Sequence, residues 1–573
     1  MPVGNLLNHC HLDGCGILLV RLVLLILPLP AALGQQHQQE SLEHLYQLRD
    51  QGAWQQILDA TGSVSPPDSE YRFLRGLALA HLGRLSDAEA ELKRAAEQAG
   101  NEGGKILVEL AGVQFKQRRF GEASKNLHRA ISMGETDPYI FDFLASLYYL
   151  EGNVEAAVKY WNRVDKPSIQ ELKVEPAGIL DPVLLDRALA LSPASEVSLR
   201  SLRLTDLRLD MLDVFARRRY DLSARQDGQF DLTIQTAEKA DIRADSPFRS
   251  LLTIARELPF RTVNADVRNI RRSAVNWSSA FRWKFGNHLF STRLAAPFGR
   301  NPNLLYHADL TVRDETWDVS SWGDGAGLTG LQLVEAKADF TSIAGDRCVW
   351  STGIATSHRD LSPGLFRSTS SDSVHSSGFA LSSTWGARYE FLRLPERRLK
   401  LSGEARWELG RFWSSNAGLF TLGDIALLGS WEAEKENRTL ISARAQTGNS
   451  AGAIPFDRLF RLGMDRDSDL LLRGHSGTSD GLKGSGPLGG GYLLTNLDVQ
   501  KRLYRNALFS WSSGPFLDSG KVFDPRSGVG RRWMWDPGLE GRVSLLGLFQ
   551  VAVSYGIDTR SGSWLVFWRV VTQ

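Results

Sequence analysis

Apolar and polar side chains alternate through the C-terminal half of this 573-residue chain, and this pattern constrains the fold more than any other feature. Alternation with a period of two residues indicates β-strands with one apolar and one polar face. The clearest segment is 399–409, LKLSGEARWEL, and the pattern returns at 308–313, 441–446 and 550–555. Clusters of Gly, Asn, Asp and Pro separate the segments, as turns require. We therefore predict an all-β region over residues 260–573.

The N-terminal segment indicates export from the cytoplasm. Arg21 precedes an apolar run at 22–29, LVLLILPL, which is followed by Pro30 and the small residues of 31–34. This order is typical of a secretory signal peptide, and the run is too short for a membrane-spanning helix. We assign residues 1–34 as the signal peptide. Its removal would leave Cys348 as the single cysteine, so no disulfide within the chain is expected.

A transmembrane barrel accounts for the β-rich half better than a soluble sandwich or propeller does. Strands of about 9 to 11 residues are long enough to cross a bilayer at a tilt. Only Trp54 and Trp161 of the 16 Trp precede residue 270, and aromatic girdles flank the lipid-facing band of such barrels. We predict a transmembrane antiparallel β-barrel of about 16 strands. Its expected girdle consists of Trp283, Trp317, Trp322, Trp350, Trp385, Trp413 and Trp431.

Residues 40–168 contain a helical repeat. Four columns of similar residues recur with members 35 and then 34 positions apart, a period specific for the tetratricopeptide repeat. The columns are Gly76, Ala111 and Ala145; Ala88, Ala123 and Ala157; Leu92, Leu127 and Trp161; and Ala95, Ala130 and Val164. Small residues let paired helices approach closely, so we predict an all-α tetratricopeptide solenoid with a concave groove. The groove is either a docking surface for a partner or part of a rigid spacer.

Two further local features belong to the N-terminal half. Gly83 and Gly152 fall at the turn within a repeat, where a left-handed residue is required, and Arg118 takes that place in the middle repeat. Residues 169–259 read as a connector, partly helical, with a hairpin turning at Asp227-Gly228.

Three segments near the C-terminus go beyond a generic barrel. A Gly/Ser-rich loop carries Arg473-Gly474-His475, the next strand carries Asn496 and Asp498, and a third segment reads Phe516-x-Asp518-x-Gly520. In this order they resemble the bacterial surface antigen superfamily, the outer-membrane barrels of protein assembly and two-partner secretion. The resemblance implies that Arg473 sits at a loop tip inside the lumen. It also implies that Asp518 is its acidic partner on the wall, with Asp498 as a second candidate.

The chain departs from this superfamily at several places. His475 stands where the family has an aromatic residue after Arg-Gly, and the chain ends in Val-Val-Thr-Gln rather than at a terminal aromatic. Family members usually carry POTRA domains on the periplasmic side. Here the tetratricopeptide array occupies that place, and a POTRA domain hidden in residues 169–259 is not expected.

The sequence shows no catalytic constellation. Gly484, Gly486 and Gly489 match G-x-G-x-x-G, but an alternating strand follows instead of a helix, so no phosphate cradle is expected. The 11 His form no recognisable metal motif, and a formal net charge of +2 does not favour nucleic acid. We expect no enzymatic activity, no cofactor, no metal and no nucleic-acid partner.

These observations predict an outer-membrane barrel with a periplasmic repeat module. It would assist insertion or translocation of proteins at the outer membrane, and the repeat groove would bind a protein client or a periplasmic partner. By family resemblance, the seam between the first and last strands would open to template client strands. One alternative is a polysaccharide-export porin with a tetratricopeptide adaptor. Another is a soluble periplasmic scaffold or binding protein.

Overall fold

The computed structural model describes residues 41–62, 68–239, 247–320, 327–363, 376–414, 417–433, 439–506, 508–525, 532–545 and 549–571. The predicted signal peptide, residues 1–34, lies outside these ranges. The chain divides into two compact units, residues 1–147 and residues 148–573. No helix among the described residues is long and apolar enough to cross a membrane.

The first unit consists of paired helices. Its helices are residues 41–50, α2 (Trp54–Gly62), α3 (Ser69–His81), α4 (Leu85–Ala99), η1 (Gly100–Glu102), α5 (Gly104–Lys116), α6 (Phe120–Ser132) and the start of α7 (Pro138–Leu150). Helix α3 packs on α4, and α5 packs on α6. All eight small residues of the Gly and Ala columns are buried. A Cβ on Gly76 would lie 2.7 Å from Cγ of Leu92, so only glycine permits this helix spacing.

The turns within the helical pairs adopt the left-handed backbone that the repeat pattern requires. Gly83 has φ 80° and Gly152 has φ 71°. Arg118 has φ 61°, so the middle pair makes the same turn without a glycine. A Cβ in this region is strained. Backbone hydrogen bonds close the turn, from the N–H of Arg118 to the carbonyl of Phe115 at 2.8 Å and from the N–H of Arg119 to that of Gln114 at 2.9 Å.

Residues 148–239, at the start of the second unit, include the last helix of the predicted repeats and most of the expected connector, 169–259. The elements are α8 (Val154–Trp161), β1 (Ser168–Glu175), α9 (Pro182–Ala188), β2 (Ser195–Glu196), α10 (Leu199–Met211), β3 (Phe215–Ala224) and β4 (Phe230–Glu238). The expected hairpin is present as β3 and β4. However, β1 pairs in parallel with β4 to give a mixed sheet of order β2-β1-β4-β3. This region is therefore a folded α/β domain.

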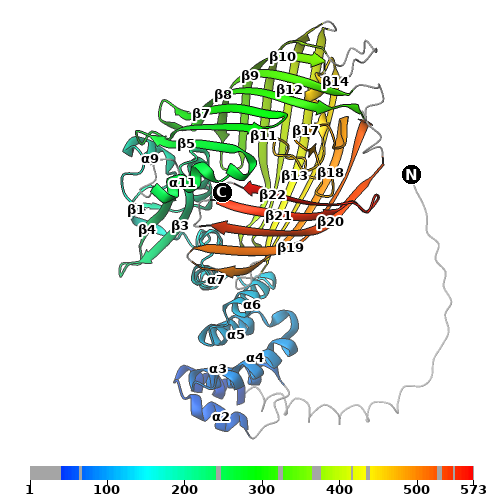
Figure 1. Cartoon of the computed structure of the whole chain (residues 1–573). Helices are drawn as coiled ribbons and strands as arrows, with labels where there is room; N and C mark the ends of the chain where they lie inside the picture. Colours follow the sequence, from blue (N-terminus) through cyan, green and yellow to red (C-terminus); the bar gives the residue numbers. More distant parts are fainter. Residues whose placement is uncertain are drawn as a thin grey trace, which may run out of the picture. The chain divides into compact units, whose positions relative to one another are not determined.

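The C-terminal region is a closed, mainly antiparallel barrel (Figure 1). Its long strands are β5 (Thr262–Ile270), β6 (Val275–Lys284), β7 (Asn287–Phe298), β8 (Asn301–Asp318), β9 (Leu328–Ala344), β10 (Cys348–Pro363), β11 (Gly378–Leu394), β12 (Leu399–Trp413), β13 (Gly418–Ala433), β14 (Thr439–Gly452), β18 (Leu488–Arg505), β19 (Phe509–Pro525), β20 (Met534–Leu545), β21 (Phe549–Ile557) and β22 (Trp564–Val571). Three strands of two residues each, β15 (Phe460–Arg461), β16 (Thr478–Ser479) and β17 (Leu482–Lys483), lie between β14 and β18.

The strand count differs from the predicted number of about 16. The barrel contains eighteen strands among the described residues, fifteen of them long. The segment before β5 lies in the predicted connector and forms α11 (Pro247–Ala255) and η2 (Leu258–Phe260), and Pro259 cannot donate to a strand ladder. Because neighbouring long strands are antiparallel and their number is odd, β5 and β22 run in the same direction where the barrel closes.

One end of the barrel packs against the α/β domain. At the β5–β6 turn, Asp181 donates its backbone N–H to the carbonyl of Arg272 at 2.7 Å. At the β11–β12 turn, the 3-10 helix η4 (Pro395–Arg397), Lys159 of α8 pairs with Glu396 at 2.8 Å. The antiparallel order then places the segment between β14 and β18 at the opposite end of the barrel.

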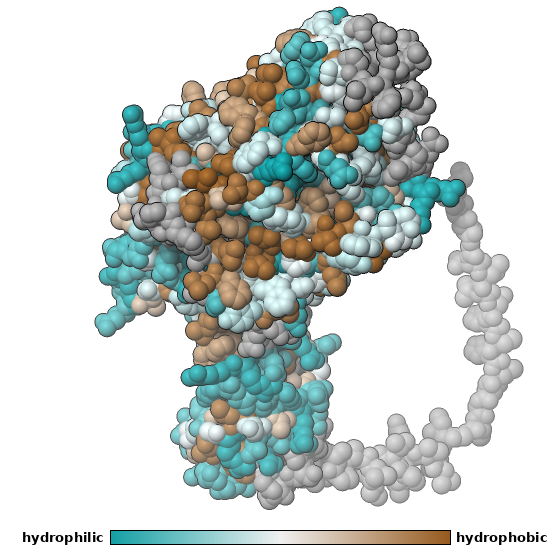
Figure 2. Space-filling view, viewed as in Figure 1, coloured by the Kyte–Doolittle hydropathy of each residue, from teal (hydrophilic) through white to brown (hydrophobic). Residues whose placement is uncertain are grey.

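The alternation in sequence corresponds to the two faces of the barrel wall. On β12, Trp407 and Leu409 are 57% and 47% exposed, whereas Glu408 between them is 8% exposed. Hydrophobic side chains gather over the strands, whereas the helices of the first unit are largely hydrophilic on this face (Figure 2). Among the predicted girdle residues, Trp283, Trp350, Trp385, Trp413 and Trp431 are exposed. The prediction is wrong for Trp317, which is buried, with its ring centre 5.1 Å from that of Phe456. Trp322 lies outside the described residues.

Candidate functional site

The segment between β14 and β18, residues 453–487, is the candidate functional site. It begins with a short 3-10 helix, η5 (Phe456–Arg458), and contains the three two-residue strands. Strand β15 pairs with β18, whereas β17 pairs with β8, which is separated from β18 by six long strands. This segment, called the lumen loop below, therefore crosses the inside of the barrel and contacts opposite walls.

Arg473 of the lumen loop is bound by Asp518 of β19. Its Nε donates to Asp518 Oδ2 at 2.8 Å and its Nη2 donates to Asp518 Oδ1 at 2.7 Å. The backbone N–H of Arg473 also donates to Asp518 Oδ2, at 2.9 Å. The Arg473 side chain is 1% exposed and that of Asp518 is 0% exposed. This two-pronged geometry matches the planar guanidinium to the carboxylate and fixes the loop tip in one orientation.

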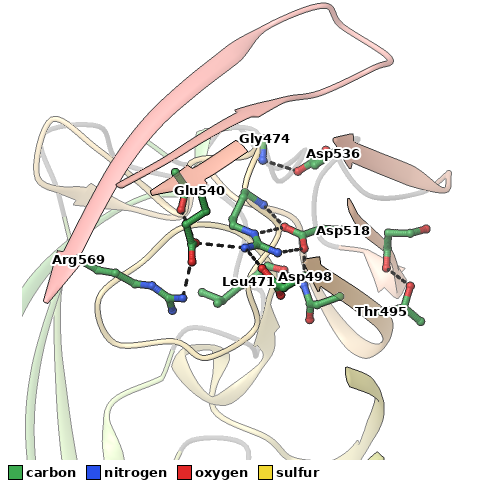
Figure 3. Close-up of polar contacts among 12 residues, drawn as sticks. Leu471, Gly474, Thr495, Asp498, Asp518, Asp536, Glu540 and Arg569 are labelled. Carbon is green, nitrogen blue, oxygen red and sulfur yellow. Dashed lines mark hydrogen bonds and ion pairs between the residues drawn. The ribbon is translucent and has the colours of Figure 1, made fainter. Parts of the chain in front are cut away.

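Two further carboxylates complete the surroundings of Arg473. Its Nη1 lies 2.6 Å from Asp498 Oδ1 on β18 and 3.2 Å from Glu540 Oε2 on β20. Figure 3 shows Asp518, Asp498 and Glu540 converging on one point from three neighbouring strands. Arg542 pairs with Glu540 at 2.6 Å, and Arg569 of β22 lies 3.9 Å from it. Three cations therefore balance three anions, which offsets much of the cost of burying them.

The Phe-x-Asp-x-Gly residues of β19 each have a distinct place. The ring of Phe516 lies under the guanidinium, with Arg473 Cζ 3.6 Å from the ring centre, a favourable cation–π arrangement. A Cβ on Gly520 would lie 3.1 Å from side-chain carbons of both Leu462 and Leu494, so glycine lets the lumen loop approach the wall. Asn496 is cross-strand to Asp518 and donates to its Oδ1 at 2.8 Å.

Gly474 and His475 contact a different part of the wall. The backbone N–H of Gly474 donates to Asp536 Oδ2 of β20 at 2.5 Å. His475 Nδ1 lies 3.0 Å from the same oxygen. A Cβ on Gly474 would lie 2.6 Å from Asp536 Cγ, and a Cβ on Gly556 would lie 2.3 Å from the carbonyl oxygen of Arg473. Glycines on both sides therefore permit the close approach of the loop tip to β20 and β21.

A second ionic cluster holds the lumen loop to β6 and β8. Lys483 Nζ lies 2.6 Å from Glu315 Oε1 and 2.8 Å from Asp467 Oδ2. Arg282 of β6 pairs with Asp467 at 3.1 Å. Lys483 and Glu315 are 1% and 2% exposed, so this anchor is as deeply buried as the Arg473 cluster.

A third cluster fixes the start of the loop. Asp457 accepts from Arg359 of β10 through both of its oxygens, at 2.7 and 3.0 Å. Its neighbour Arg458 donates to Glu408 of β12 at 2.8 Å. The lumen loop is thus anchored to three separate parts of the barrel wall.

Sequence reasoning missed the residues that pair across the lumen. Asp536 and Glu540 lie on β20, outside the recognised motifs, and Lys483 lies in the same loop as Arg473 but outside its motif. Asp536 and Glu540 carried a signal, because they occupy polar positions of an alternating strand, where charged lumen-facing residues are expected. Among the described residues, one group could offer three metal-ligand atoms within 4.8 Å of one another, namely His475, Asp536 and Asp558. No metal had been expected there.

Known proteins similar to this chain are found among solved structures. No protein-family model matches the chain, and no curated protein sequence matches it. Among solved structures, CdiB from Acinetobacter baumannii is 10% identical with a TM-score of 0.43, covering 80% of this chain and 85% of that one. CdiB from Escherichia coli is 12% identical with a TM-score of 0.44, covering 71% and 76%. BamA from Haemophilus ducreyi lacking POTRA domains 1-3 is 12% identical with a TM-score of 0.42, covering 71% and 84%.

Proposed function

We propose that this protein is an outer-membrane β-barrel of the bacterial surface antigen type that assists insertion or translocation of proteins. The observation that carries the proposal is the buried pair of Arg473 and Asp518 inside a closed barrel. In the superfamily that the sequence resembles, an Arg at a loop tip meets the acidic residue of a Phe-x-Asp-x-Gly strand in the lumen. Arg473 and Asp518 occupy these places here. The proposed role is not enzymatic.

The outer face of the barrel supports a membrane location. Large apolar side chains such as Ile354, Leu419 and Ile425 are 62%, 66% and 58% exposed, whereas the charged clusters lie inside. Soluble monomers rarely expose continuous apolar areas larger than a few hundred Å². A lipid environment removes this cost, and it disfavours the soluble-scaffold alternative.

The helical repeats and the α/β domain fit a periplasmic role. A folded domain directly before the barrel is where the resemblance places POTRA domains. Against the expectation from the sequence, we therefore infer from the mixed sheet that residues 168–238 serve as one. The tetratricopeptide array would then extend this module and bind a protein client or a periplasmic partner through its groove. Stacked helical pairs provide an extended surface for such binding.

The seam between β5 and β22 supports a template mechanism. Because both strands run in the same direction, a client strand inserted between them would be antiparallel to each. Antiparallel pairing is slightly more stable per residue than parallel pairing. Insertion of one client strand would thus close the seam through two antiparallel ladders.

Folding of a client protein by the reconstituted protein tests this proposal. Full-length protein in lipid vesicles is mixed with an urea-unfolded eight-stranded outer-membrane barrel, and the folded fraction is followed by gel mobility. We expect folding at least about ten times faster than in empty vesicles, equivalent to about 1.4 kcal/mol off the barrier. The control is a chain in which a disulfide joins β5 to β22 and keeps the seam shut. Equal rates in empty and loaded vesicles would overturn an insertion role.

The polysaccharide-export alternative requires an open lumen. A glycan would pass through the lumen, which the three ionic anchors of the lumen loop obstruct. A large, steady conductance of the native barrel in planar bilayers, together with binding of a charged glycan, would favour that alternative.

A further inference from the structure

The side chains of His475, Asp536 and Asp558 meet from three different elements of the second unit. His475 Nδ1 at the tip of the lumen loop is 3.0 Å from Asp536 Oδ2 on β20. His475 Nε2 is 3.6 Å from Asp558 Oδ2, in the turn between β21 and β22. Each side chain offers one ligand atom, and the three atoms lie within 4.8 Å of one another. The fold thus gathers three metal-ligating groups from positions far apart in the chain.

The separations of these atoms suit a small divalent cation. Zinc accepts histidine nitrogens and carboxylate oxygens at about 2.0–2.2 Å, and the ligand atoms of a tetrahedral set then lie about 3.4 Å apart. The separations of 3.0 Å and 3.6 Å lie on either side of this value. A closure of the cluster by about 1 Å therefore brings one atom of each side chain onto a single ion.

The charge of the cluster also calls for a cation. The side chains of Asp536 and Asp558 are 0% and 9% exposed, so two carboxylates share a site with little water. Histidine binds metals as the neutral imidazole, which leaves two negative charges to be balanced. Arg473, two residues from His475, is already engaged by three other carboxylates. Arg560, next to the cluster in sequence, is exposed and forms none of the ion pairs found among the described residues.

One oxygen of Asp536 gives independent support. Its Oδ2 accepts the backbone N–H of Gly474 at 2.5 Å and faces His475. Its Oδ1 is buried and has no hydrogen-bond partner among the described residues. A buried ionised oxygen without a partner is costly. An ion held by this carboxylate would remove that cost, which neither the loop backbone nor the neighbouring side chains do.

We propose that His475, Asp536 and Asp558 form a zinc site that fastens the tip of the lumen loop to β20 and to the β21–β22 turn. One nitrogen and two carboxylate oxygens leave the fourth position of the ion to water. Calcium takes about six to eight oxygen ligands, so it does not suit three side chains of which one offers nitrogen. The site goes beyond the proposed function and does not depend on it.

The place of the site gives the ion a structural role. The turn that carries Asp558 leads directly into β22, which borders the seam of the barrel. Arg473 already ties the loop tip to β18, β19 and β20. Zinc would extend this attachment to the last hairpin of the barrel.

Zinc binding by the full-length protein in detergent tests the proposal. The protein is stripped with EDTA and dialysed against buffered Zn²⁺ alone, and bound metal is counted per chain by mass spectrometry. We expect one zinc per native chain, and affinity at least about tenfold weaker in His475→Phe and in Asp558→Asn. His288→Phe is the matched control, because His288 faces a single exposed carboxylate, that of Asp314, at 3.9 Å. This variant should bind zinc as the native chain does.

A second measurement separates loss of the site from loss of the fold. Each variant is checked for the compact, heat-modifiable form on unboiled gels, and zinc should raise the thermal transition of the native chain and of His288→Phe alone. Absence of zinc binding by the native protein would overturn the proposal. So would binding that His475→Phe and Asp558→Asn both retain, since the ion would then lie elsewhere, or tighter binding of Ca²⁺ than of Zn²⁺. The assay needs no client protein, so its failure is distinct from failure of the insertion role.

Discussion

The guanidinium of Arg473 is central to the packing inside this barrel. Arg473 faces Asp518, Asp498 and Glu540, and two of these carboxylates are wholly buried. Without a cation they would face each other on adjacent strands, a costly arrangement in a region poor in water. Arg473 therefore joins the lumen loop to the wall and also neutralises the carboxylates of the wall.

Replacement of Arg473 by Ala should destabilise the barrel by about 3–5 kcal/mol, since it leaves buried charges without a partner. Arg473→Lys keeps the charge but loses the two-pronged bond to Asp518, so we expect an intermediate loss. The measurement is the temperature at which the compact, heat-modifiable form disappears on unboiled gels. A native-like transition in Arg473→Ala would contradict the assigned role.

Gly556 offers a test that leaves every charged group in place. A Cβ there would lie 2.3 Å from the carbonyl oxygen of Arg473, so Gly556→Ala should push the loop tip from β21 at a cost of about 1–3 kcal/mol. Gly541→Ala, on neighbouring β20, is the matched control, because its nearest contact would be 3.9 Å away. The two variants are compared by thermal transition. Equal transitions would show that the loop tip does not pack on β21.

At the level of elements, the lumen loop links strands on opposite sides of the barrel. Its first part is held by Asp457 and Arg458, its middle by Asp467 and Arg473, and its end by Lys483. These anchors reach β6, β8, β10, β12 and the strands from β18 to β20. Loss of one anchor should therefore loosen one part of the loop while the others remain bound.

Lys483→Met should release the end of the lumen loop from β8. Glu315 and Lys483 are both nearly fully buried, so removal of the cation is expected to cost about 3–5 kcal/mol. Hydrogen exchange should increase in peptides covering 478–487 but not in those covering 471–475. Lys501→Met, at an exposed position on β18, is the control and should change neither.

The close packing of the helical pairs can be tested at Gly76. Gly76→Ala would place a Cβ 2.7 Å from Leu92, so α3 and α4 should separate at a cost of about 1–3 kcal/mol. Gly112→Ala, in α5, meets nothing within 4 Å and should instead stabilise by up to about 1 kcal/mol through helix propensity. Exchange rates of α3 and α5 peptides in the full-length variants measure both. Equal effects would refute the close packing of the small-residue column.

The periodicity of the sequence predicted the helices and strands well. It did not predict which side chains pair across the lumen. The alternation on β12 assigned Trp407 and Glu408 to opposite faces, as the structure has them. The strand count differed because three of the eighteen strands are two-residue pieces of the lumen loop. Arg473 and Asp518 could be named from family resemblance. The pairing of Lys483 with Glu315 and that of Glu540 with Arg473 could not be predicted, because alternation indicates that a position faces the lumen but not which residue it pairs with.

Across the whole molecule, the helical unit and the barrel are stabilised in different ways. The helical unit depends on small residues that let helices approach, whereas the barrel depends on a continuous strand ladder and on buried ion pairs inside it. The α/β domain, packed on the turns at one end of the barrel, makes the second unit continuous from residue 148. A barrel braced by its own loop fits the proposed function, in which the protein works at its wall and its seam rather than through an open pore.

Conductance in planar bilayers tests this account most directly. Purified full-length protein is compared with a variant in which residues 465–485 are replaced by a short Gly-Ser linker. We predict that the native barrel inserts with small, brief openings, and that the variant gives large, steady ones because the lumen is cleared. A native conductance as large as that of the variant would contradict the account.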